Sequence, residues 1–169
     1  MISRINIFNI IRAHWNTFRN ISKQKRDWAG LILMFFFPAA AASLLFYTSG
    51  IVLYNHISDL LTFVSIIGGF LFNLLAIIHT ILEKVSNDPN SDVVRKLYAK
   101  EIHANIAFGI LVALITSFLL VLSFFECPDV FQKIKGFNVL GWALYFFLIL
   151  FLLNLLLILK KIFIVLDNP

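Results

Sequence analysis

Charged residues make up only 14% of this 169-residue chain, and it has a single cysteine, Cys127. One cysteine cannot form an intrachain disulfide, so disulfides do not hold the fold. No histidine or cysteine group has the spacing of a zinc site. We find no glycine-rich phosphate loop and no serine-nucleophile motif. The long apolar runs also lack acidic residues at mid-depth, which disfavours proton-coupled transport. The sequence therefore predicts a protein that is not an enzyme and holds no metal or cofactor.

Hydrophobic residues are abundant, at 60% of the chain, and 19 residues are phenylalanine. A water-soluble fold of this size could not bury so much apolar surface. Four apolar runs approach or exceed the ~20 residues that cross the hydrocarbon core. Such runs must be helical, because lipid offers the backbone no hydrogen bonds. The sequence therefore predicts an all-α integral membrane protein with four transmembrane helices, over residues 31–54, 60–82, 102–125 and 140–159.

The orientation follows from the positions of the 14 lysines and arginines. Twelve lie in the N-terminal segment, in the loop between the second and third spans, and just after the fourth span. Only Lys133 and Lys135 lie in the two other connectors. Cytoplasmic loops carry the excess of basic residues. We expect a multi-pass protein of the bacterial inner (plasma) membrane with both termini in the cytoplasm.

Residues 1–28 predict a basic amphipathic helix on the cytoplasmic side, separate from a transmembrane domain over residues 29–169. Its apolar side chains recur at helical spacing and not in one block, unlike those of a signal peptide. Ile5, Phe8, His14 and Lys25 fall off the expected faces. The helix either lies along the inner leaflet, with its basic edge toward lipid phosphates, or binds an anionic cytoplasmic ligand. The candidate ligand-binding residues are Arg12, Trp15, Arg19, Lys23, Arg26, Arg95 and Lys96.

The second span carries nearly all of its small and polar residues on one side. At 100° per residue they occupy an arc of about 140°. Only one bulky apolar residue, Phe72, interrupts the arc. We call this set the stripe, and its members are Ser65, Gly68, Gly69, Phe72, Asn73, Ala76, His79, Thr80 and Glu83.

Two interpretations of the stripe remain open. Small residues permit close helix packing, and Asn or His can hydrogen-bond across helices in lipid. Alternatively, one such helix from each subunit lines a water-filled pore, with Phe72 as the constriction. Four close-packed helices leave no conduit inside one chain, so a pore requires a cyclic oligomer. We interpret the weaker stripe of the third span as packing, and the fourth span as lipid-facing or paired through Asn154. Residues of the third-span stripe are Asn105, Gly109, Ala113 and Thr116.

The layout resembles the small four-helix membrane effectors of bacterial anti-phage defence, and is most similar to the channel effector of the Hailong system. The resemblance covers the whole chain as an architecture and rests on residues 4–26, 65–73 with 79–83, and 97–105. It implies a homotetrameric ion channel whose opening depolarises the infected cell. It also implies a partner nucleotidyltransferase that makes single-stranded DNA oligomers, and these hold the channel shut.

Other functions fit parts of the same pattern. The membrane component of the Kiwa defence system is also similar, and would imply a cytoplasmic protein partner in place of a nucleotide ligand. A membrane anchor or sensor that recruits a soluble partner needs the basic segments but no pore. A small transporter or membrane-enzyme subunit is disfavoured by the lack of intramembrane acids. An ion channel effector of immunity is the function that the sequence favours, with membrane lipids and further copies of the chain as its contacts.

Overall fold

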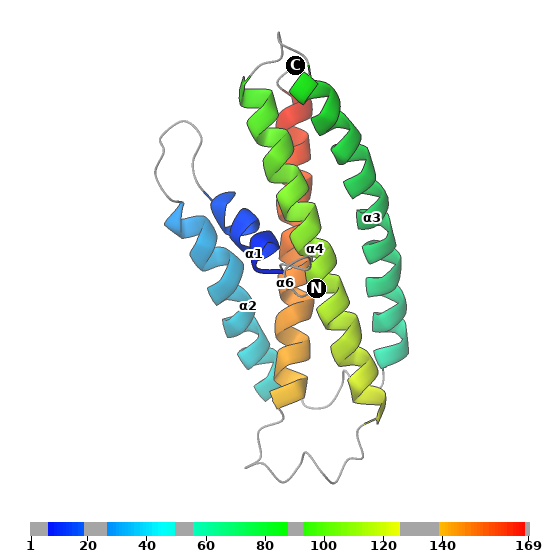
Figure 1. The fold of residues 1–169 in the computed structure, drawn as a ribbon. Helices are drawn as coiled ribbons and strands as arrows, with labels where there is room; N and C mark the ends of the chain where they lie inside the picture. Colours follow the sequence, from blue (N-terminus) through cyan, green and yellow to red (C-terminus); the bar gives the residue numbers. More distant parts are fainter. Residues whose placement is uncertain (1–6, 19–26, 50–55, 88–92, 126–138, 168–169) are drawn as a thin grey trace.

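The computed structural model describes residues 7–18, 27–49, 56–87, 93–125 and 139–167 (Figure 1). They form α1 (Ile7–Asn16), α2 (Trp28–Ser49), α3 (Ile57–Asn87), α4 (Val93–Phe125) and α6 (Val139–Asp167), and these ranges contain no strand. All but α1 are long and apolar enough to cross a membrane. The prediction of an all-α integral membrane protein with four spanning helices is confirmed.

The helix bounds extend most of the predicted spans. Helix α2 begins three residues early, at Trp28, where the Asp27 carboxylate accepts a hydrogen bond from the Gly30 N–H at 3.1 Å and caps the helix. Helix α4 begins at Val93, so the charged stretch before the predicted third span belongs to the same helix. Helix α6 runs past both terminal lysines to Asp167. Residues 50–54 of the first predicted span lie outside the described ranges.

The spanning helices form an open row, whereas the sequence suggested a closed bundle. Helix α4 packs on α3 and on α6, and α6 packs in turn on α2. Figure 1 shows α2 and α3 at opposite edges, with the short α1 between α2 and α4. About 50% of the α4 span is buried, against 22–28% for the other three, so α4 is the centre of the protomer.

Helix α3 packs on α4 through an apolar face. Val64, Leu71 and Ile78 of α3 are buried, and their spacing keeps them on one side of a helix. Gly68 belongs to this contact, because a Cβ there would meet the Ala113 Cβ at 3.5 Å. Small residues on both helices therefore bring the two backbones close together.

A buried polar contact joins α4 to α6. The Asn154 side-chain amide donates to the Asn105 backbone carbonyl at 3.1 Å, and both residues are fully buried. Gly109 makes room for it, because a Cβ at that position would lie 2.5 Å from Asn154 Nδ2. Asn105, Gly109, Ala113 and Thr116 are all buried, which confirms the packing role expected of the third-span stripe. Pairing of the fourth span through Asn154 is confirmed as well.

Helix α2 packs on α6 at the other edge of the row. The Trp142 indole of α6 donates to the Ser43 hydroxyl of α2 at 3.1 Å. Ser43 in turn donates to the Ala39 carbonyl of its own helix, so both side chains are satisfied without water. Pro38 and Ala42 of α2 are buried, so the proline lies inside the protein and does not face lipid.

Candidate functional site

Helix α3 has three faces along its length. The first is the apolar face on α4. The second is an exposed apolar face with Ile66, Phe70 and Ile77, which suits contact with lipid acyl chains. The stripe lies between these two faces. Helix α3 packs mainly on α4 and stands at the edge of the row (Figure 1), and most of the stripe is exposed on the outer side of the protomer.

The structure places the predicted pore-lining residues on that outward face, with one exception. Gly68 is buried against Ala113, so it is a packing residue of the α3–α4 contact. The other members are exposed, and these are Ser65, Gly69, Phe72, Asn73, Ala76, His79, Thr80 and Glu83. Gly69 has open space where a Cβ would be. Apart from Gly68, and from His79 beside His103 of α4, no contact of the stripe with another described helix is seen.

The exposed polar groups of the stripe differ in whether they need a hydrogen-bond partner outside their own helix. Thr80 donates to the carbonyl of Ile77 in its own helix at 2.7 Å, and is thereby satisfied in any surroundings. Asn73 lies near the middle of the Ile57–Val85 span, and its amide has no partner among the described residues. An amide that faces hydrocarbon without a partner is costly, on the order of several kcal/mol. Asn73 therefore needs water or another protein surface.

His79 lies on the edge of the stripe that is next to α4. Its ring centroid is 6.3 Å from that of His103 on α4, so the two imidazoles are neighbours across the helix contact. Glu83 is one helical turn beyond His79 and is exposed. The described residues contain no group of three or more histidine, cysteine or acidic side chains that could hold a metal ion.

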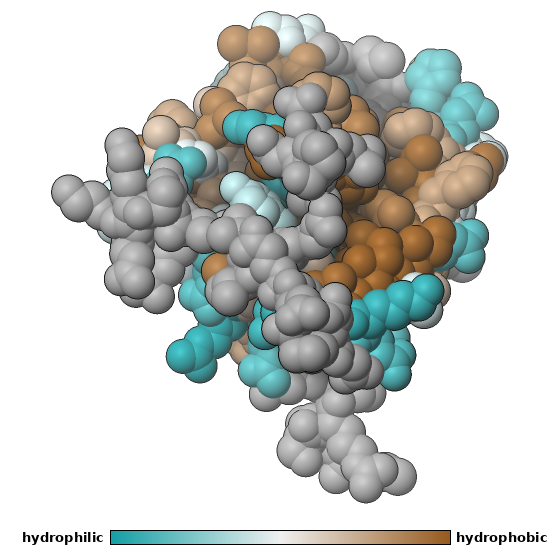
Figure 2. Space-filling model, turned by 90° about the horizontal axis from the view of Figure 1, so that it is seen from above, coloured by the Kyte–Doolittle hydropathy of each residue, from teal (hydrophilic) through white to brown (hydrophobic). Residues whose placement is uncertain are grey.

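The candidate ligand-binding residues are only partly described. Arg12 is exposed on α1, and Lys96 is half-buried in the first turn of α4, which also contains Arg95. Arg19, Lys23 and Arg26 lie outside the described residues. Figure 2 looks onto the end where α3 ends and α4 begins, and hydrophilic and hydrophobic side chains are mixed there.

Trp15 is not a free stacking platform for a base. Its ring centroid lies 5.5 Å from that of Phe35, so the indole packs on α2 and is 37% exposed.

Sequence reasoning missed a buried polar cluster that attaches α1 to the spanning helices. His14 is fully buried, although it fell outside the expected apolar face of α1. Its Nδ1 lies 2.9 Å from Asn105 Oδ1 of α4, and its ring stacks on Phe108 with centroids 3.8 Å apart. The Thr17 hydroxyl lies 3.0 Å from the same Asn105 oxygen and 2.8 Å from the His14 carbonyl. We call His14, Thr17, Asn105 and Phe108 the α1 clasp.

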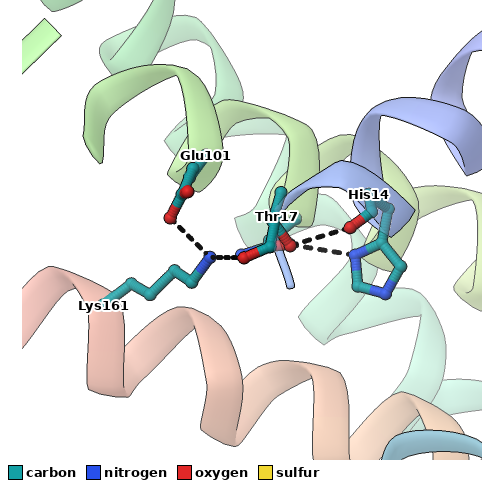
Figure 3. Close-up of polar contacts among 5 residues, drawn as sticks. His14, Thr17, Glu101 and Lys161 are labelled. Carbon is teal, nitrogen blue, oxygen red and sulfur yellow. Dashed lines mark hydrogen bonds and ion pairs between the residues drawn. The ribbon is translucent and has the colours of Figure 1, made fainter. Parts of the chain in front are cut away.

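Lys161 of α6 connects the clasp to a third helix. Its Nζ donates to Glu101 Oε2 of α4 at 2.9 Å and lies 3.4 Å from the backbone carbonyl of Thr17 (Figure 3). The side chains of Lys161 and Glu101 are both largely buried, so each charge depends on the other for compensation. A cation beside the last carbonyls of α1 also complements the negative end of the helix dipole. The sequence signal for this cluster was His14, which falls off the expected apolar face of the N-terminal helix, together with Asn105 in the third span.

Burial and the surrounding charges keep His14 neutral. Desolvation lowers the pKa of His14 to about 4, the Asn105 hydrogen bond opposes this shift, and the nearby Lys161 ammonium adds to it. Asn105 Oδ1 can only accept, so Nδ1 carries the proton and Nε2 is a bare acceptor. Nε2 has no partner among the described residues.

The lowered pKa predicts that attachment of α1 weakens in acid. A released His14 titrates near its usual value of about 6.5, whereas the attached residue resists protonation until about pH 4. The free energy that stabilises the attached state is therefore at its full value above pH 6.5. It decreases between pH 6.5 and 4, by roughly 3 kcal/mol in total. The rate of amide hydrogen exchange of residues 14–18, corrected for its intrinsic pH dependence, should rise as the pH is lowered from 6.5 to 4. The same rise in a His14→Gln variant would contradict the assignment to His14.

The sequence matches no protein-family model, no curated protein and no solved structure. The function must therefore be inferred from the site itself.

Proposed function

We propose that the protein is an ion channel of identical subunits whose aqueous pathway is lined by the stripe of α3. The observation that carries the proposal is Asn73, a polar amide near the middle of a membrane span that is exposed on the outer face of the protomer. Facing lipid, it would be unsatisfied. Facing a water-filled pathway shared with other copies, it is hydrated.

The arrangement of the helices supports a cyclic oligomer. The described helices form an open row, and α3 stands at its edge. Cyclic symmetry brings the same edge of each copy to one axis. The resemblance to the channel effectors favours a homotetramer. Glu83 then forms an acidic ring at one mouth, and like charges there favour cations.

The membrane and its sidedness are part of the proposal. Twelve of the 14 basic residues lie in the N-terminal segment, in the loop between the second and third spans and after the fourth span, which supports a cytoplasmic location of both termini and of that loop. A Ser91→Cys variant in a Cys127→Ser background should react with an impermeant thiol reagent only in inverted vesicles. Reaction from outside intact cells would reverse the orientation.

The resemblance also supports a role in anti-phage defence, in which opening depolarises the infected cell and an anionic oligonucleotide keeps the channel shut. Basic residues of the N-terminal segment, such as the exposed Arg12, would meet the phosphates. Purified protein should bind short single-stranded DNA with an affinity that falls steeply with salt. Changing Arg12, Arg19 and Lys23 together to Ala should abolish binding, and undiminished binding would remove this segment as the ligand site.

Current through the purified protein in a planar bilayer tests the channel itself. Conductance above that of the empty bilayer is expected once the closing ligand is removed. An assembled oligomer that never conducts would favour the alternative, a membrane anchor that recruits a soluble partner.

A further inference from the structure

Helix α1 is attached to the spanning helices by few and specific contacts. It packs on α4, and its ten residues are too few to form a stable helix in isolation. Ile7, Phe8 and Ile11 on its apolar face remain exposed. The α1 clasp, with two side chains converging on Asn105 Oδ1 and one ring stacked on Phe108, is the polar part of its anchor, and the buried Phe18 adds an apolar part.

The attached state is incompletely satisfied. Three buried polar atoms have no hydrogen-bond partner among the described residues: His14 Nε2, Asn105 Nδ2 and Asn154 Oδ1. All three belong to the clasp or bond to it directly. An unpaired buried polar group is unfavourable relative to a hydrated one. Release of α1 would allow water to reach the Asn105 amide and the His14 imidazole, and this hydration favours release.

The clasp is continuous with the contact between α3 and α4. Asn105 and Gly109 are one helical turn apart on α4. A Cβ at Gly109 would lie 3.2 Å from the Leu71 side chain of α3 and 2.5 Å from Asn154 of α6. Asn154 in turn donates to the carbonyl of Asn105. Asn105 is therefore connected, through one turn of α4, to the contact with the helix that carries the stripe.

We propose that α1 is a regulatory clasp, attached to α4 when the pathway is closed and released from Asn105 when it opens. This inference rests on the proposed channel function. We assign the resting state to the attached form, because this is the form in the structure, with His14 and Thr17 both on Asn105 Oδ1. A factor that draws the N-terminal segment away from α4 would open the channel, and a factor that keeps it in place would hold the channel shut.

The test separates attachment from conduction. Thr17 is only 9% exposed, so a Thr17→Cys variant in a Cys127→Ser background reports attachment through its rate of labelling by a water-soluble maleimide. This reporter loses the Thr17 hydroxyl but keeps the contact of His14 with Asn105, so every further variant is compared with the reporter itself. Asn105→Leu removes the acceptor of His14 and Thr17 and keeps the backbone carbonyl that Asn154 uses. Thr116→Val is the matched control, because Thr116 is an equally buried polar residue of α4 whose hydroxyl bonds only its own helix.

We expect Asn105→Leu to raise the labelling rate at position 17 at least tenfold and the open probability in planar bilayers several-fold. The Thr116→Val variant should change neither. Unchanged labelling with Asn105→Leu would show that the clasp does not hold α1, and this would overturn the inference. Faster labelling with unchanged current, in a wild-type channel that conducts, would overturn the coupling and leave the channel proposal standing.

A second variant allows the attachment of α1 to be switched reversibly by a disulfide. Thr17→Cys combined with Asn105→Cys places two thiols where side-chain oxygens now lie 3.0 Å apart. Oxidation should lock α1 in place and suppress the current, and reduction should restore it. Equal currents in both redox states would contradict a clasp. If no variant conducts while labelling still follows Asn105, the channel proposal fails and α1 attachment stands as a separate property.

Discussion

Replacing Phe72 with alanine should give a protein that leaks ions without any activating signal. Phe72 is the one bulky apolar member of the stripe and is 53% exposed in the protomer. In a ring of subunits, one such side chain from each copy narrows the pathway and repels water. Its removal hydrates the constriction, so we expect resting current in planar bilayers to rise at least several-fold and expression to become toxic.

Phe70→Ala is the matched control. Phe70 is 64% exposed, but it lies on the apolar face of α3. Neither substitution removes a buried ring, so the loss of about 3–5 kcal/mol that follows Phe→Ala in a core is not expected within the protomer. The Phe70 variant should be electrically silent. Equal currents from the two variants, with both oligomers intact in detergent, would mean that Phe72 is not at a constriction.

Replacing Gly109 with valine should cause the largest loss of stability within a protomer. The new side chain would overlap Asn154 Nδ2, only 2.5 Å from its Cβ, and would press on Leu71 at 3.2 Å. Asn154 would then lose its bond to the Asn105 carbonyl. Overpacking and the lost hydrogen bond together cost roughly 3 kcal/mol. Thermal unfolding in detergent, followed by circular dichroism, should show a transition several degrees lower.

Gly69→Val is the control for that effect. A Cβ at Gly69 has no neighbour within 4 Å in the protomer, so unfolding of the isolated protomer should be unchanged. Gly69 belongs to the stripe, however, and a larger side chain there should weaken assembly if α3 approaches other copies. Destabilisation of the protomer by both variants would contradict the packing around Gly109.

The spanning helices could be predicted from composition alone, because lipid permits only one backbone solution for a long apolar run. The order of these helices in space could not be predicted in this way.

Periodicity identified the stripe, but whether the stripe faced the core or the outside depended on which face of α3 meets α4. The answer lies in Val64, Leu71 and Ile78, which the sequence does not distinguish from the other branched apolar residues of that helix.

The α1 clasp was missed for a different reason. Hydrophobic periodicity assumes that the apolar face of a helix is the buried one. In α1 the contact with α4 uses His14 and Thr17, and apolar residues such as Phe8 stay exposed, as they can beside lipid. A polar residue off the expected face of a short helix, together with an asparagine in a distant span, was the available signal. Their pairing across 91 residues requires the fold.

Cysteine modification along α3 tests most directly whether the stripe lines a water-filled pathway. Ala76 and Ile77 are adjacent and both exposed in the protomer, but Ala76 lies on the stripe and Ile77 on the apolar face. Each is changed to Cys in a Cys127→Ser background and treated with a charged, water-soluble thiosulfonate during current recording. The channel account predicts that the reagent reacts at position 76 and changes the current, while position 77 stays unreactive in lipid. Equal reaction at both positions, or reaction at position 77 alone, would contradict it.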